Sequence, residues 1–152
     1  MTSESTLKMT TNVSWYAHDV ATGEIVQQGE AHNLVTNAGL DLVRDLLDGD
    51  SVAGITHFAV GTGSAAATAL DTTLDTEVFR DTVSGRTSNA QQLVVQYYLN
   101  SADANGNTLT ELGLFNAASA GTLFARVALG TSIVKTAAIA VTLNWSINLG
   151  AA

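Results

Sequence analysis

The chain has no cysteine, no proline and little charge of either sign. Without cysteine it has no disulfide, no thiolate nucleophile and no Cys-ligated zinc site. Lysine and arginine together number only six and the formal net charge is -8, which argues against binding nucleic acid through its phosphates or docking on an anionic membrane. No apolar run has the length of a signal peptide or of a membrane span, so we expect synthesis in the cytoplasm and no membrane partner.

The residue composition favours burial of the protein surface in an assembly. Hydrophobic residues make up 46% of the 152 residues and charged residues only 13%. Few long charged side chains means that little side-chain entropy is lost when surface is buried, and that a free monomer has little colloidal protection. The length predicts one domain. We expect a flexible N-terminal segment over residues 1–9 and a single β-rich domain over residues 10–152.

The clearest pattern is strict alternation from Ala137 to Leu149. Side chains of a β-strand point to opposite faces with period two, so this segment predicts one long strand. Its apolar face belongs to a core. The other face has only small or neutral polar groups, whereas solvent-facing strands normally carry charge. We therefore predict that it contacts protein, in the first place another copy of the chain, through Ala138, Ala140, Thr142, Asn144, Ser146 and Asn148.

The remaining segments predict a mainly β fold. Residues 38–48 have apolar positions at helical spacing with Gly49 at the stop position, which predicts one clear α-helix. Leu70 to Arg80 is either weakly helical or extended. The other expected elements are a hairpin (12–19 with 25–32), two strands (55–60 and 91–100) and a second hairpin (108–116 with 122–129). We predict a two-layer antiparallel β-sandwich.

Candidate chemical motifs are weak. Gly61–Ala66 lacks the Lys-Ser/Thr of a phosphate-binding loop and is better explained by a tight turn. Asp103–Asn107 begins like a calcium loop, but Leu114 stands where the essential glutamate would be. The carboxylates that could suggest acid–base catalysis are Asp71, Asp75 and Glu77, and the histidines are His18, His32 and His57. Neither set has the spacing of a site, so we expect no catalytic residue, metal or cofactor.

Two adjacent aromatic pairs, Trp15-Tyr16 and Tyr97-Tyr98, lie on predicted strands, so one ring of each pair points outward. An outward ring can anchor a protein interface or stack on a sugar. No amide cluster is apparent beside them in the sequence, which favours the interface. Trp15, Tyr97 and Tyr98 are therefore added to the interface candidates, and a carbohydrate-binding module remains the alternative.

Several segments, taken in order, resemble small virion structural proteins of tailed bacteriophages, of the tail collar, fibre or baseplate type. The resemblance runs from about residue 33 to 149 and ends in Lys135-Thr136 and the alternating strand. The matching segments are Asn33–Gly39, Ile55–Gly63, Thr73–Arg80, Glu111–Asn116 and Gly121–Arg126.

The resemblance implies a non-enzymatic β-rich module in the virion that assembles around a symmetry axis, as a trimer or ring. Its partners would be copies of itself and other virion proteins. With the resemblance as guide, we expect Glu111 and Arg126 to pair across the second hairpin, and Glu77 and Arg80 to clasp a neighbour. Because no shaft or receptor-binding tip follows, we expect a joint, ring, collar or capsid-decorating role rather than host recognition.

Overall fold

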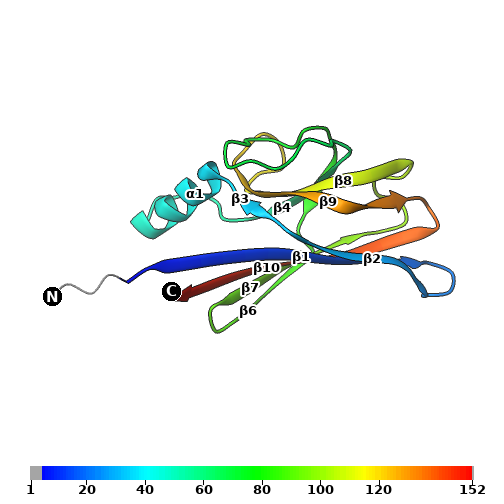
Figure 1. Ribbon diagram of the computed structural model, residues 1–152, viewed down its shortest axis with the longest axis horizontal. Helices are drawn as coiled ribbons and strands as arrows, with labels where there is room; N and C mark the ends of the chain where they lie inside the picture. Colours follow the sequence, from blue (N-terminus) through cyan, green and yellow to red (C-terminus); the bar gives the residue numbers. More distant parts are fainter. Residues whose placement is uncertain (1–4, 152) are drawn as a thin grey trace.

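The computed structural model describes residues 5–151 and has two five-stranded antiparallel sheets packed face to face, with one α-helix at an end (Figure 1). In spatial order, sheet A contains β2 (Ile25–His32), β1 (Leu7–Asp19), β10 (Ile139–Ala151), β7 (Gln92–Leu99) and β6 (Gly85–Asn89). Sheet B contains β3 (Leu34–Val35), β9 (Leu123–Lys135), β8 (Asn107–Phe115), β4 (His57–Gly61) and β5 (Glu77–Thr82). The predicted two-layer β-sandwich is confirmed.

The predicted long strand is β10, the central strand of sheet A. It pairs with β1 over the full 13 residues of each strand. The strand begins at Ile139 rather than at Ala137, because the Ile139 N–H donates to the Thr136 carbonyl and closes a turn there. Ala138, one of the interface candidates, lies in this turn and not on the strand.

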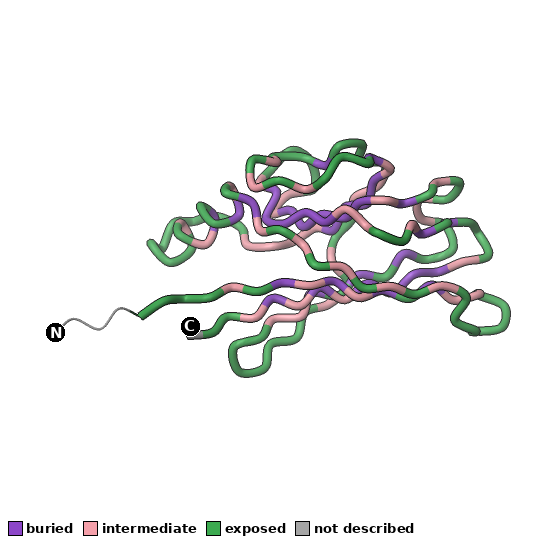
Figure 2. Tube along the Cα trace, viewed as in Figure 1, coloured by how far each residue is buried: buried purple, intermediate pink, exposed green. Residues whose placement is uncertain are grey.

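The core lies between the sheets and is built from the inward residues of the strands (Figure 2). On β10 the odd-numbered residues point inward, and Trp145 is fully buried. Its ring meets Phe58 of β4 edge-on with centroids 5.8 Å apart, and Phe58 stacks on Tyr97 of β7 at 5.1 Å. Aromatic rings from both sheets therefore hold the two layers together.

The helix α1 (Asn37–Asp48) begins and ends where its capping residues place it. The Thr36 hydroxyl accepts the Gly39 N–H at the start, and Gly49 takes a left-handed conformation at the end. Thr36 also binds the backbone of β9 through Leu123, so the cap fixes the helix to sheet B. The helix extends past the end of sheet B and lies over the beginning of β1 and the end of β10 (Figure 1). Across the described residues, no helix is long and apolar enough to cross a membrane.

Two segments differ from expectation, and a third, left open between helix and extended chain, is decided. Leu7–Met9, expected in a flexible segment, belong to β1 and pair with the end of β10, while residues 1–4 lie outside the described residues. The segment Leu70 to Arg80 forms no helix: residues 71–76 are irregular with bends, and the extended strand β5 begins at Glu77. The polar stretch 84–90 contains the edge strand β6, whose backbone pairs with β7 although the strand has no apolar face.

Candidate functional site

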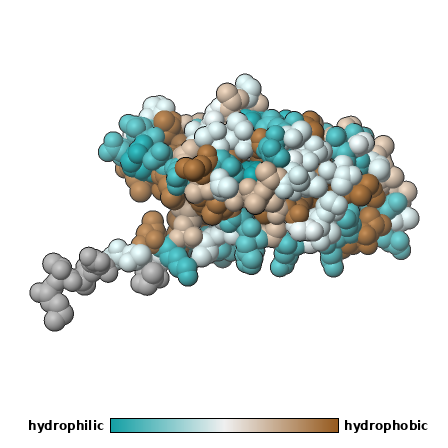
Figure 3. All heavy atoms as spheres, turned by 45° about the horizontal axis from the view of Figure 1, so that its top comes forward, coloured by the Kyte–Doolittle hydropathy of each residue, from teal (hydrophilic) through white to brown (hydrophobic). Residues whose placement is uncertain are grey.

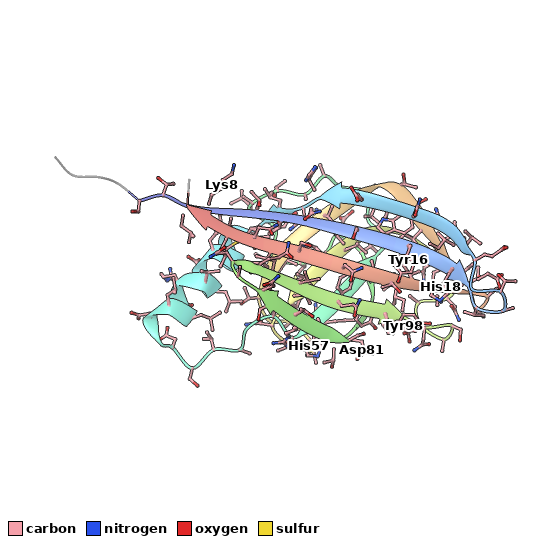
Figure 4. The ribbon with its side chains drawn as sticks, turned by 90° about the horizontal axis from the view of Figure 1, so that it is seen from below. Lys8, Tyr16, His18, His57, Asp81 and Tyr98 are labelled. Carbon is pink, nitrogen blue, oxygen red and sulfur yellow. The ribbon has the colours of Figure 1, made fainter. Side chains whose placement is uncertain are left out.

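The outer face of sheet A is the surface that the alternation of β10 singled out. No second layer of the described chain covers this face, which Figure 4 shows from below. Along the three central strands β1, β10 and β7, the residues that point outward between the strand ends carry neither a carboxylate nor a cationic group; Lys8 stands at one end of β1. The sequence pattern of one strand thus extends to three neighbouring strands.

Half of this face is a set of neutral polar side chains that we call the amide patch. Its side chains bond one another across the strands: Gln96 donates to Asn144 at 3.0 Å, and Gln92 donates to Asn148 at 2.8 Å. The patch carries no charged side chain. Its members are Asn12, Gln92, Gln96, Asn144, Ser146 and Asn148.

The other half is an aromatic patch, made of Tyr16, His18 and Tyr98 (Figure 4). The His18 ring lies 6.2 Å from Tyr16 and 6.1 Å from Tyr98, centroid to centroid. Between them in the sheet stand Ala140 and Thr142, which are buried although they face outward. The interface candidates Ala140 and Thr142 are therefore already covered within the monomer, because small side chains let the larger neighbouring ones close over them.

Two other interface candidates belong to the core. Trp15 and Tyr97 are 3% and 2% exposed, whereas the outward rings of the two pairs are Tyr16 (37%) and Tyr98 (43%). Burial, with the carboxylate of Asp81 as a further cause, raises the pKa of the Tyr97 hydroxyl. One ring of each pair points outward as predicted, but Tyr16 takes the place assigned to Trp15.

The sequence held a signal for this choice. Trp15 has the parity of the buried Val13 and Ala17, and Tyr97 has the parity of Val95 and Leu99. On each strand the apolar parity marks the inward face. Applied to β1 and β7, the same rule that found β10 places Tyr16 and Tyr98 outside.

Glu77 and Arg80, which the resemblance led us to expect at a neighbour, contact each other within the chain. Arg80 Nη2 lies 2.6 Å from Glu77 Oε1, and the guanidinium stacks over the Phe115 ring at 3.5 Å. Arg80 also donates to the carbonyls of Ala117 and Ala120. These contacts fix the β8–β9 loop on β5, which gives the pair a role inside the monomer.

The expected pair of Glu111 and Arg126 exists and lies at the centre of a buried network. Arg126 Nη2 lies 2.8 Å from Glu111 Oε2, and both side chains are buried. The Glu111 carboxylate also accepts the N–H groups of Gly63, Asp75 and Thr76. One carboxylate on β8 thereby holds both ends of the loop between β4 and β5.

The carboxylates Asp71 and Asp75 line a shallow hollow of about 320 Å³ beside Arg126. Asp71 pairs with Arg126 at 2.8 Å and accepts the Thr68 N–H, while Asp75 accepts the N–H groups of Ser64 and Ala65. Burial raises the pKa of Asp71, but the Thr68 N–H and Arg126 together lower it below its ordinary value. General acid catalysis needs a carboxyl that keeps its proton near neutral pH, which the lowered pKa of Asp71 does not suit. The hydrogen bonds of both carboxylates instead hold the loop between β4 and β5.

Gly61, the last residue of β4, and Gly63 allow the backbone to pack closely against its neighbours, as expected of a tight turn. A side chain at Gly61 or Gly63 would overlap Glu111, and at Gly63 it would also overlap Asp75. The glycines therefore let this backbone approach the buried carboxylate. Within residues 5–151, no three or more histidines and carboxylates stand together as metal ligands would.

A second surface lies at the helix end of the molecule. An apolar groove of about 390 Å³ opens between α1 and the extended ends of sheet A. Apolar side chains gather there below the helix (Figure 3). Several large ones at its rim are exposed to solvent, namely Leu7, Leu46, Leu47 and Leu149.

Comparison of the chain with protein-family models, with curated proteins and with solved structures finds no match.

Proposed function

We propose that this chain is a non-enzymatic structural protein of a tailed-bacteriophage virion. It self-assembles, as a trimer or ring, in the tail, baseplate or collar, or it decorates the head. The phage assignment rests on the order of the sequence segments described above. The assembly role rests on the surface of the molecule.

The observation that carries the assembly role is the uncovered outer face of sheet A, which carries no charged group along its three central strands between the strand ends. Exposed sheet faces normally carry charged side chains, and the buried centres of protein interfaces are depleted of charge. The amide patch has this composition over three strands, and two pairs of its amides are bonded to each other, Gln96 to Asn144 and Gln92 to Asn148. Each of these bonds uses one N–H and one carbonyl oxygen, so the remaining amide groups are free to hydrogen-bond a partner that covers them.

The apolar rim at the helix end supports the same role. Leu47 is 80% exposed and Leu7 is 64% exposed, beside a groove lined by apolar side chains. Exposed apolar groups that gather in one place mark surfaces that contact protein or ligand. Assembly that buries this end removes apolar area from water.

The test is a charge placed at the middle of the amide patch. Ser146 faces Asn12 on β1 and Val94 on β7, so a lysine there finds no carboxylate beside it. Burying an unpaired charge costs several kcal/mol, and ~1.4 kcal/mol is a tenfold change in affinity. Ser146→Lys should therefore weaken self-association at least about 100-fold, as measured by sedimentation velocity over a range of concentrations.

Ser119→Lys is the matched control, because Ser119 is exposed in the β8–β9 loop away from sheet A. This control should associate like the unmodified chain. A chain that remains monomeric at every concentration would refute the assembly role, as would a Ser146→Lys variant that assembles normally. The phage assignment requires in addition that peptides of this chain be found in purified phage particles.

A further inference from the structure

We propose that the aromatic half of the outer face of sheet A binds a neutral saccharide chain, with Tyr16 as the stacking residue. This binding goes beyond the assembly role and does not depend on it, because Tyr16 and Gln28 lie two rows along the face from Ser146.

The site is a hollow of about 400 Å³ beside the Tyr16 ring, within the range of about 300–1,000 Å³ usual for small-molecule sites. It lies between β1 and β2, over the backbone of Trp15 and Gly29, whose own side-chain positions face the core: an added Cβ at Gly29 would overlap the buried Trp15 indole. The hollow is lined by Ser14, Trp15, Tyr16, Gln28, Gly29 and Glu30.

The polar groups around the hollow are free to bind a ligand. Within residues 5–151, the side chains of Ser14, Gln28 and Glu30 form no hydrogen bond and no ion pair. They present a hydroxyl, an amide and a carboxylate to one side of an exposed aromatic ring. Sugar hydroxyls both donate and accept hydrogen bonds, and these three groups supply donors and acceptors of matching kinds.

The aromatic patch extends this surface beyond a single ring. Tyr16 and Tyr98 are the exposed tyrosines on the two sides of β10, and His18 lies between them. The C–H face of a pyranose is apolar and packs on the face of an aromatic ring, while its hydroxyls point outward to polar groups. Rings set along an open face suit a chain of sugars better than one enclosed monosaccharide.

The charges around the hollow favour a neutral ligand over an anionic one. Glu30 lines the hollow, and the outward residues of the three central strands supply no arginine or lysine apart from Lys8, which stands at the far end of the face (Figure 4). With a net charge of -8, the chain repels phosphorylated, sulfated or uronic-acid polymers at this position. A neutral polymer carries no such penalty.

The amide cluster that sequence reasoning did not find beside the aromatic rings is present in the fold. Gln28 stands opposite Tyr16 on β2, and Asn144 and Gln96 are one row further along the face. These amides come from three different strands. Only the pairing of these strands brings the amides beside the aromatic rings.

The experiment is affinity electrophoresis of the full chain in gels that contain one soluble polysaccharide each: glucans, mannans, galactans and xylans as neutral probes, and dextran sulfate as the anionic probe. We expect at least one neutral polymer to retard the chain and dextran sulfate not to do so. Tyr16→Ala and Gln28→Ala should each weaken the retardation at least tenfold, and Tyr16→Phe should retain most of it, because the stacking ring remains.

Leu70→Ala is the matched control, since Leu70 is 81% exposed and lies outside sheet A. No retardation by any neutral polymer would overturn the proposal, as would equal retardation of the unmodified chain and the Tyr16→Ala variant, or a preference for dextran sulfate. If Tyr16→Ala instead abolishes self-association and no polymer binds, a second copy of the chain occupies this surface and the saccharide site is refuted. Ser146→Lys should bind the polymer normally, so failure of the assembly role and failure of this site are distinguishable.

Discussion

The Glu111 carboxylate should be the most costly polar group to remove from this protein. It is fully buried, it pairs with Arg126, and it accepts three backbone N–H groups from the loop between β4 and β5. Loops whose backbone groups approach a core need such acceptors, because an unpaired buried N–H costs about 1–3 kcal/mol. Glu111→Ala removes every one of these bonds at once.

The magnitude follows from what the substitution leaves behind. Arg126 remains buried with Asp71 as its other carboxylate partner, and the N–H groups of Gly63, Asp75 and Thr76 lose their acceptor. Removing one partner of a buried ion pair typically costs about 3–5 kcal/mol. We expect a loss of that size in the free energy of unfolding, out of a total of about 5–15 kcal/mol for a protein of this kind.

Arg126→Met should cost less than Glu111→Ala, because the carboxylate keeps its three N–H donors when the guanidinium is removed. Urea denaturation followed by tryptophan fluorescence measures both losses. Amide exchange reports on the loop directly: the N–H groups of Gly63 and Thr76 should lose their protection in Glu111→Ala.

The control is Asp41→Ala, since Asp41 pairs with Arg44 on the exposed side of α1 and surface pairs contribute little. A loss of less than about 1 kcal/mol for Glu111→Ala, the value of one ordinary hydrogen bond, would refute this reasoning. So would unchanged protection of the loop amides, or a larger loss for Arg126→Met.

Two further predictions concern the helix anchor and the loop clasp. Gly39→Ala should destabilise the protein by about 1–3 kcal/mol in urea denaturation, because its Cβ would overlap the Phe124 carbonyl and push α1 off β9; Gly54→Ala, with open space around it, should be neutral. The folded-state pKa of Asp71 lies below the unfolded value of about 3.9, so its contribution to stability is present above about pH 4 and is lost as the pH falls through the folded value. Denaturation midpoints between pH 5 and pH 2 should therefore fall less steeply in Asp71→Asn than in the unmodified chain, and equal slopes would contradict the pairing with Arg126.

Local patterns in the sequence were enough to establish the strand β10, the helix α1 and the sandwich. The alternation of β10 depends only on the period of a strand, and the start and end of α1 depend on Thr36 and Gly49 as caps. Composition likewise excluded cysteine chemistry before any fold was known. Each of these conclusions uses residues that are neighbours in the chain.

The tertiary structure alone decided which residues share a surface. Ala140 and Thr142 have the parity of an outer face, yet they are buried because β1 and β7 bring Tyr16, His18 and Tyr98 around them. The amides beside Tyr16 likewise come from other strands. Strand pairing joins residues far apart in sequence, and local periodicity determines the face on which a side chain lies but not the neighbours it meets there.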